Sequence, residues 1–216
     1  MNEPVVLLTG FEPFGGDTVN PSLDIVRALD GALIEGHRIA GAGLPTVFAD
    51  TVGLLETLLA EKRPRLVLAL GLADKRQVIS LERVAINLID ARIADNSGAQ
   101  PVDVRIVEEA PDAYFSTLPV KAMAQRLREA HIPVELSQSA GTFVCNQVFF
   151  ALMHLLAQRH PGVRGGFVHV PHVPQAAARA GLTGMPLATM IDAVRLLVQT
   201  ALTTGEDLHY PAGSIQ

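Results

Sequence analysis

Short runs of valine, leucine and isoleucine alternate along the chain with longer segments of helical composition, and this alternation constrains the fold most. Brief aliphatic runs that end at glycine or proline are typical of buried strands. Such runs predict strands at residues 5–9, 39–44, 66–70, 132–136 and 166–170, and a longer strand or strand pair at 78–90. Helices are predicted at residues 20–29, 50–62, 117–130, 145–159 and 186–202. The alternation favours an α/β fold with a twisted, largely parallel sheet that is covered on both faces.

The length of 216 residues predicts one domain that spans residues 1–216, with residues 205–216 as a loose tail. The net charge is −5 and the chain has no basic cluster, so we expect neither nucleic acid nor an anionic membrane surface as a partner. The longest apolar stretch, within residues 143–157, is shorter than the about 20 residues that a membrane span needs. The N-terminus lacks the charge and the apolar length of a signal peptide.

Cys145 is the only cysteine, which excludes an internal disulfide and a cysteine-rich zinc site and favours a reducing, cytosolic setting. We expect no metal and no cofactor. The thiol follows a glycine-bearing turn at residues 139–142 and lies at the start of a long apolar helix. Free N–H groups and the positive dipole end at a helix start lower a thiol pKa and produce a nucleophile. A lone cysteine is equally often a small buried hydrophobe, so this stretch alone leaves both interpretations open.

A nucleophilic thiol needs a base and a group that orients the base. Among seven histidines, His169 is favoured because it ends a predicted strand, where sites gather in α/β sheets, and His172 is the alternative. Glu82 is the favoured carboxylate, because strand alternation places it on a face with large aliphatic side chains, where a charge requires a partner. The other candidate carboxylates are Asp74, Asp90 and Asp95.

Two further features have competing interpretations. Arg92 could stabilise an oxyanion, or it could form an ordinary surface ion pair. The glycine-rich loop at residues 10–16 carries Phe11 and Phe14, which would form a pocket wall or fold back onto the core. The loop lacks the Lys-Ser/Thr ending of a P-loop and the GxGxxG spacing, so its signal for phosphate binding is weak.

Several sequence blocks, in order from residue 7 to residue 174, together resemble the pyroglutamyl peptidase I family of cysteine peptidases, also called pyrrolidone-carboxylate peptidases. The blocks are GFEPFGG (10–16) with NPS (20–22), ERVAINLIDARIADN (82–96), YFSTLP (114–119), SAGTFVCNQVFF (139–150) and GFVHVPHVP (166–174). Five separate blocks make the resemblance highly specific. It implies a single three-layer α/β/α domain with a twisted, mixed sheet, a cytosolic location and a homotetramer.

The resemblance also assigns residues. It implies that Cys145 is the nucleophile, His169 the base and Glu82 the acidic residue of an enzyme that removes N-terminal pyroglutamyl groups from peptides through a thioester. The substrate-binding positions that it implies are Phe11, Phe14, Asn20, Thr46, Arg92, Ile93, Phe143 and Val144.

One segment departs from the family pattern. Members of the family often have a segment of small residues, rich in glycine, after the second strand. Here the charged residues Asp74, Lys75 and Arg76 follow that strand, which leaves the effect of this segment on substrate affinity open but does not alter the catalytic assignments. Two other classes of protein remain as alternatives. One is a non-catalytic binder of blocked N-termini, and the other is a nucleoside phosphorylase-like protein that uses the glycine-rich loop for phosphate.

Overall fold

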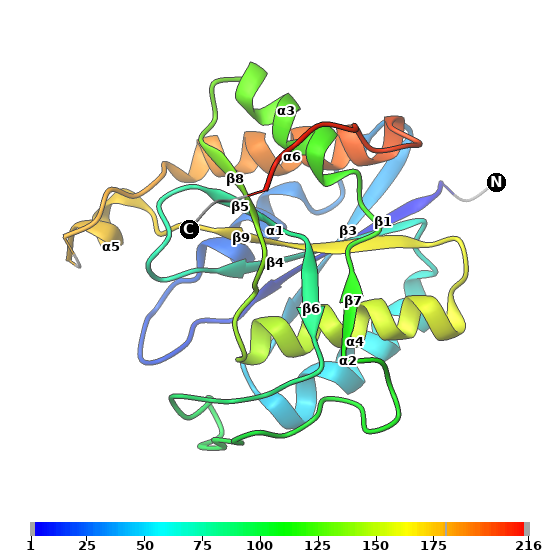
Figure 1. The fold of residues 1–216 in the computed structure, drawn as a ribbon. Coiled ribbons are helices and arrows are strands. Elements are labelled where there is room, and N and C mark those ends of the chain that lie inside the picture. The colour runs from blue at the N-terminus through cyan, green and yellow to red at the C-terminus, as the bar shows by residue number, and fades with distance from the viewer. Residues whose placement is uncertain (1–2, 180, 214–216) are drawn as a thin grey trace.

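The computed structural model describes residues 3–179 and 181–213 and has three layers, with a central sheet between two layers of helices (Figure 1). The strand order of the central sheet is β2-β3-β1-β4-β9-β5-β8. Its strands are β1 (Val5–Phe11), β2 (Leu33–Ile34), β3 (His37–Leu44), β4 (Leu66–Leu72), β5 (Ile79–Glu82), β8 (Val134–Ser137) and β9 (Arg164–Val170). A second, two-stranded sheet contains β6 (Val84–Ile86) and β7 (Ala113–Phe115). The helices are α1 (Pro21–Leu29), α2 (Phe48–Lys62), α3 (Val120–Glu129), α4 (Val144–Arg159), α5 (Pro174–Arg179) and α6 (Leu187–Thr203).

The central sheet is mixed and mostly parallel, which confirms the predicted fold class. Strands β3, β1, β4 and β9 run parallel to one another, and β5 runs antiparallel to β9. Strand β8 pairs in parallel with β5, and β2 pairs antiparallel with β3. The carboxyl ends of β1, β3, β4 and β9 therefore meet at one edge of the sheet, where α/β proteins place their sites.

Two apolar cores fill the space between the central sheet and the helices, one on each face of the sheet. Helices α1, α3 and α6 contribute most of the helical residues of one core, and α2 and α4 those of the other. Alternate residues of β9 divide between the cores, since Val168 belongs to the first and Phe167 to the second. Alternation along a strand explains this division, because successive side chains point to opposite faces.

The segment predicted as a strand or strand pair at residues 78–90 is a pair whose members lie in different sheets. Strand β5 belongs to the central sheet and β6 to the small one, with Arg83 between them. The expectation that Glu82 shares one strand face with the aliphatic residues after it is therefore wrong. Glu82 is nonetheless fully buried, because β5 lies between β8 and β9.

The segment at residues 205–216, expected to be a loose tail, is described as far as residue 213, and residues 214–216 lie outside the described part. Its described portion contacts the start of α3. The Asp207 carboxylate accepts hydrogen bonds from the N–H groups of Lys121 and Ala122, and the Lys121 ammonium donates to the carbonyl of Tyr210 at 2.6 Å. A carboxylate at a helix N-terminus satisfies free donors and the helix dipole, and this explains the attachment.

Within residues 3–179 and 181–213, no helix combines the length and apolar character that a membrane crossing requires. The same residues contain no group of three or more histidine, cysteine, aspartate or glutamate side chains arranged to hold a metal ion.

Candidate active site

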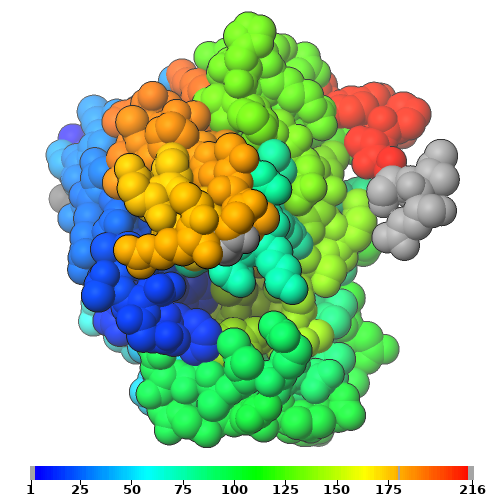
Figure 2. Space-filling view, turned by 90° about the vertical axis from the view of Figure 1, so that its left-hand side faces the viewer, coloured from blue at the N-terminus to red at the C-terminus, as the bar shows by residue number. Residues whose placement is uncertain are grey.

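The segments that follow the carboxyl ends of β1, β3, β4 and β9 surround a cavity of about 470 Å³. Figure 2 shows the surface hollowed where the blue N-terminal loop, the teal segment after β4 and the green segment after β6 approach one another. The volume lies within the usual range for small-molecule sites. The lining residues are Phe11, Phe14, Gly15, Asp17, Val19, Asn20, Thr46, Leu72, Asp74, Arg92, Ile93, Phe143, Cys145 and His172.

The cavity brings together Cys145 and all but one of the substrate-binding positions expected from the sequence. The exception is Val144, whose side chain is fully buried in the core beneath α4 and does not line the cavity. Successive residues of a helix point about 100° apart, so Val144 faces the sheet while Cys145 reaches the cavity. The expectation for the Val144 side chain is therefore wrong.

Aromatic rings form one wall of the cavity. The Phe143 ring lies 5.4 Å from the Phe14 ring and 5.1 Å from the Phe48 ring between centroids, the latter edge-on at 83°. These distances fall within the range of favourable aromatic pairs. Phe48, the first residue of α2, supports this wall although the sequence analysis did not single it out.

Register places the thiol and the histidine on the same face of the central sheet. Gly71 of β4 is the direct partner of His169 of β9, and directly paired residues point to one face. A methyl group built on Gly71 would come within 2.9 Å of the Cys145 sulfur and 2.8 Å of the Phe167 ring. The sulfur therefore packs over Gly71, beside the strand position of His169, and only glycine leaves it room.

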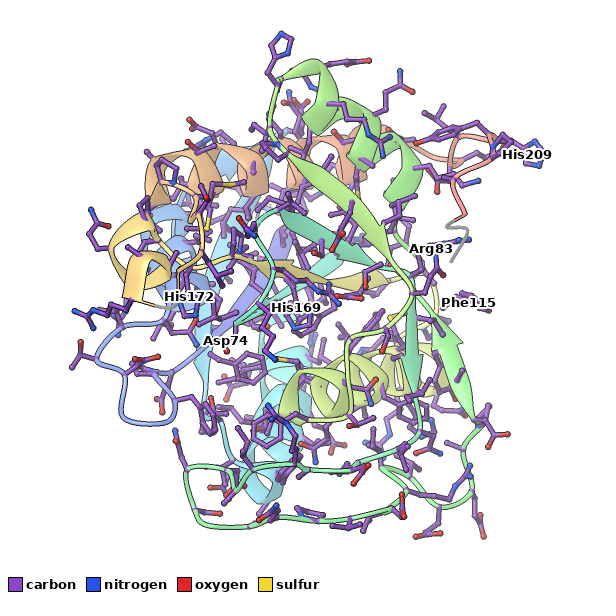
Figure 3. All side chains as sticks on the ribbon, turned by 60° about the vertical axis from the view of Figure 1, so that its left-hand side comes forward. Asp74, Arg83, Phe115, His169, His172 and His209 are labelled. Carbon is purple, nitrogen blue, oxygen red and sulfur yellow. The ribbon has the colours of Figure 1, made fainter. Side chains whose placement is uncertain are left out.

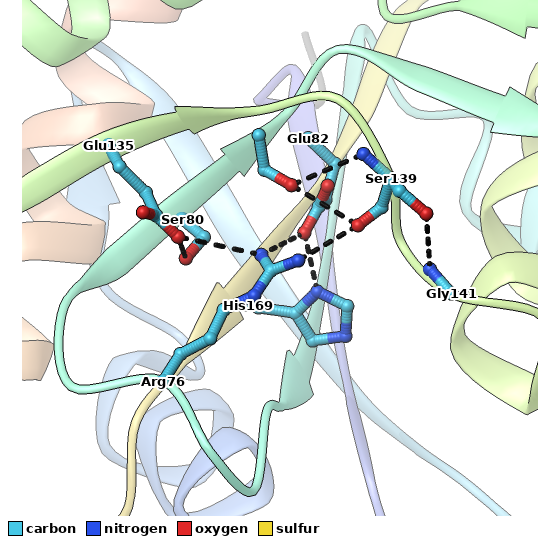
Figure 4. Close-up of polar contacts among 8 residues, drawn as sticks. Arg76, Ser80, Glu82, Glu135, Ser139, Gly141 and His169 are labelled. Carbon is cyan, nitrogen blue, oxygen red and sulfur yellow. Dashed lines mark hydrogen bonds and ion pairs between the residues drawn. The ribbon is translucent and has the colours of Figure 1, made fainter. Parts of the chain in front are cut away.

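Glu82 reaches the same place from β5. It pairs with Phe167, which lies two residues before His169 on β9, so Glu82 and His169 are diagonal neighbours on one face. The Nδ1 of His169 donates to Oε1 of Glu82 at 2.7 Å. Both side chains are buried, with 6% of the histidine and none of the glutamate exposed. Figure 4 shows this contact at the centre of a polar network.

The alternative histidine, His172, also has a carboxylate partner. Its Nε2 lies 2.8 Å from Oδ1 of Asp74, whose side chain is 81% exposed. Figure 3 shows these two residues side by side at the outer part of the site, whereas His169 lies deeper, at the end of β9. An exposed pair is screened by water and holds an imidazole less firmly than a buried one.

The structure corrects the pKa that the sequence led us to expect for the Cys145 thiol. Burial raises the pKa of the Cys145 thiol to about 12, and the negative charge of Glu82 adds to the rise. The positive charge of Arg76 and a hydrogen bond from the backbone N–H of Cys145 itself act in the opposite direction but are outweighed. Loss of water around the sulfur thus dominates over the helix start, and the thiol is protonated at neutral pH.

The start of α4 nevertheless offers hydrogen-bond donors. Phe143 is the N-cap, and among the described residues no acceptor meets the N–H groups of Val144 and Asn146, while the N–H of Cys145 faces its own sulfur. Arg92, at the cavity rim, is exposed and makes no hydrogen bond or ion pair with any residue that the structure describes. Both features leave donors available near the thiol.

Two polar residues of the cavity also hold the loops in place. Asn20 caps α1 by accepting a hydrogen bond from the N–H of Ser22 at 3.1 Å, and its amide donates to the carbonyl of Glu12. Thr46 donates to the same carbonyl. These contacts tie the phenylalanine-bearing loop to α1 and to the end of β3.

Of the other candidate carboxylates, Asp95 serves the loop rather than the histidine. It is 6% exposed and accepts from the N–H groups of Phe48, Ser97 and Ala99 and from the Ser97 hydroxyl. Burial raises the pKa of Asp95, but these hydrogen bonds together outweigh it and hold the pKa below its usual value. Asp95 thereby fixes the loop that presents Arg92 and Ile93.

This arrangement predicts a pH-dependent stability. Asp95→Asn should lower the free energy of unfolding at pH 7 by roughly 2 kcal/mol, a typical contribution of hydrogen bonds to a charged group. Because the folded-state pKa lies below the unfolded value of about 3.9, the contribution is complete above that pH and is lost as the pH falls through the folded-state pKa. Urea unfolding at pH 7 and pH 3 measures it, with Asp90→Asn as the control. A loss that is the same at both pH values would contradict the assignment.

Several lining residues were not anticipated from the sequence: Gly15, Asp17, Val19 and Leu72. Leu72 carried a usable signal, because it directly follows Gly71 at the carboxyl end of a predicted strand. The other three lie in the loop before α1, where no periodicity indicates which side chains face inward.

Comparison with known proteins identifies the family. A family model described as pyroglutamyl peptidase matches residues 4–204. A pyrrolidone-carboxylate peptidase of Cupriavidus taiwanensis is 51% identical over 215 residues, which are 98% of this chain and 99% of that protein. One of Klebsiella pneumoniae is 50% identical over 210 residues, 97% of this chain and 98% of that protein. The crystal structure of Bacillus amyloliquefaciens pyroglutamyl peptidase I has a TM-score of 0.93 and 39% identity, and covers 95% of this chain and 100% of that one. The chain therefore belongs to the pyroglutamyl peptidase family.

Proposed function

We propose that this protein hydrolyses the amide bond after an N-terminal pyroglutamyl group of a peptide, with Cys145 as nucleophile, His169 as base and Glu82 as the group that orients the base. One observation carries the proposal. The only thiol of the chain lies at a helix start, faces a cavity, and packs beside the strand that bears a buried histidine–glutamate pair.

Acylation begins with proton transfer. Because the Cys145 thiol is protonated at neutral pH, Nε2 of His169 removes its proton as the sulfur attacks the pyroglutamyl carbonyl. Glu82 accepts a hydrogen bond from Nδ1, which leaves Nε2 free for this transfer and stabilises the imidazolium that forms. When the tetrahedral intermediate collapses, His169 returns the proton to the leaving amine and a thioester remains on Cys145.

Deacylation uses the same groups. His169 takes a proton from a water molecule that attacks the thioester carbonyl, and collapse of the second intermediate releases pyroglutamate and returns the proton to the sulfur. In both steps the developing oxyanion is stabilised by the free N–H groups at the start of α4 and by Arg92. One such donor contributes about 3 kcal/mol in known enzymes.

The cavity chemistry suits a neutral, ring-shaped acyl group. The lactam has no charge, and Phe11, Phe14 and Phe143 offer it an apolar wall. A free N-terminal ammonium would lose its hydration against these rings, at a cost of several kcal/mol. The pocket therefore selects blocked N-termini over free ones.

We further propose, from the resemblance of the sequence to this family, that residues 1–216 act as one catalytic domain in the cytosol and that the chain forms homotetramers. Sedimentation velocity of the purified protein tests the assembly, since a monomer at micromolar concentration would contradict it.

A panel of fluorogenic amides tests the substrate. We expect release of aminomethylcoumarin from the pyroglutamyl compound at a kcat/KM at least about 100-fold above that for the prolyl and glutaminyl compounds, because each of these carries an ammonium group that the pocket rejects. The prolyl compound is the sharper control, since it keeps the five-membered ring. Comparable rates for the prolyl and pyroglutamyl compounds would overturn the proposed specificity.

A further inference from the structure

Arg76 lies in the loop between β4 and β5 and points toward the buried glutamate. Its Nη1 donates to Oε1 of Glu82 at 2.6 Å, and its Nη2 donates to the carbonyl of Ser139 at 2.8 Å (Figure 4). The side chain is 28% exposed, whereas Glu82 is fully buried. Arg76 does not line the cavity, although Asp74 of the same loop does.

The same carboxylate oxygen, Oε1 of Glu82, accepts hydrogen bonds from both Arg76 and His169. Its two lone pairs are thereby occupied, so a proton on Glu82 could sit only on Oε2. That oxygen is buried and has no hydrogen-bond partner among the described residues. A buried carboxylate is costly unless a positive charge compensates it, and the guanidinium is a charge that does not titrate in this pH range.

We propose that Arg76 is a positioning residue, which keeps Glu82 a hydrogen-bond acceptor and so holds His169 in the tautomer whose Nε2 can take the thiol proton. Without Arg76, a protonated Glu82 would donate to Nδ1, and His169 would carry its own proton on Nε2, where it cannot act as a base. This inference rests on the proposed function, because it concerns the histidine that we propose as the base.

The second hydrogen bond gives Arg76 a further effect. Ser139 belongs to the loop that leads into α4, so the guanidinium links the acidic residue to the segment that presents Cys145. Three titratable groups belong to this network with Arg76: Glu82 of β5, His169 of β9 and Glu135 of β8. Oε1 of Glu135 lies 3.9 Å from Nη1 of Arg76 and accepts a hydrogen bond from the Ser80 hydroxyl. Cys145 of α4 is affected by the charges of Glu82 and Arg76.

Removal of the charge tests the proposal. Arg76→Gln should lower kcat roughly 100-fold, toward the lower end of general-base contributions, and leave KM within about threefold, because Arg76 does not touch the cavity. The acid limb of the pH profile of kcat/KM should move to higher pH, since an uncompensated Glu82 binds a proton more readily. Lys75→Gln is the matched control: it removes the same charge from an exposed residue of the same loop that does not line the cavity, and it should behave as the wild type.

Arg76→Lys separates the effect of the positive charge from the effect of the rigid, two-pronged hydrogen bonding of the guanidinium. A lysine keeps the positive charge but cannot hold Glu82 and Ser139 in one rigid geometry, so it should restore the acid limb and bring kcat back to within about tenfold of the wild type. If Arg76→Lys were as impaired as Arg76→Gln and had the same displaced pH profile, charge compensation would be wrong.

A double substitution tests whether Arg76 acts through Glu82. In a Glu82→Gln background, Arg76→Gln should cost less than about threefold in kcat, because coupled residues do not add. An undiminished loss would overturn the inference. Wild-type kinetics in Arg76→Gln would also overturn the inference, provided that the wild type itself cleaves the pyroglutamyl amide. An inactive wild type would instead count against the proposed function, and circular dichroism of each variant separates loss of folding from either result.

Discussion

Cys145→Ala is expected to abolish the release of coumarin from a pyroglutamyl-coumarin amide, with a loss of at least roughly 10⁴-fold in kcat, as for other nucleophile deletions. The variant retains the α4 donors and the cavity but has no atom that can form the thioester. The substitution removes one sulfur atom from a half-buried position over Gly71, so the fold should persist. Initial rates against the wild type, with a thermal melt of each protein, measure both statements.

Cys145→Ser provides the matched comparison for the same site. The hydroxyl preserves the shape of the side chain but is a poorer nucleophile, so it too should be nearly inactive, and both variants should still be stabilised thermally by the uncleaved substrate. Retained turnover in a folded Cys145→Ala protein would sink the assignment. A wild type that binds the amide but never cleaves it would favour the non-catalytic binder instead.

The second large effect concerns the choice between two histidines. His169→Gln should lower kcat/KM by about 10²- to 10⁴-fold, the usual contribution of a general base, because glutamine cannot take the thiol proton. His172→Gln should keep activity within about tenfold, since His172 pairs with an exposed carboxylate at the outer part of the site. The same fluorogenic assay compares the two variants directly.

A larger loss of activity in His172→Gln than in His169→Gln would assign the base to the His172–Asp74 pair. Glutamine is suited to both positions because it retains a polar side chain of moderate size, so neither variant leaves a large void. Equal losses would mean that His172 contacts the substrate or the leaving amine, and in that case KM rather than kcat should change for His172→Gln.

The raised pKa of the thiol changes how reactivity tests should be interpreted. A thiol with a pKa of about 12 in the resting protein exposes little thiolate at neutral pH, so slow alkylation by iodoacetamide is compatible with an active enzyme. Alkylation therefore does not separate a catalyst from an inert binder here, whereas turnover does.

Local sequence determined most of the secondary structure. The short aliphatic runs became strands of the central sheet, and Asn20, Pro21 and Ser22 began a helix because capping depends only on adjacent residues. The position of Cys145 at the start of α4 was likewise predictable from a glycine turn before an apolar run. The choice among candidate partners came from the family resemblance and not from spacing.

Only the tertiary structure decided which of these residues meet. The antiparallel pairing of β5 with β9 makes Glu82 a diagonal neighbour of His169, and no local pattern encodes strand order. The phase of α4 sends Val144 into the core and Cys145 to the cavity. Burial then overrides the helix start in setting the thiol pKa, and Arg76 reaches Glu82 although the sequence suggested a role for its loop in substrate affinity. The physical reason is common to all four: contact and desolvation depend on packing between distant segments, whereas propensity and capping depend on neighbours along the chain.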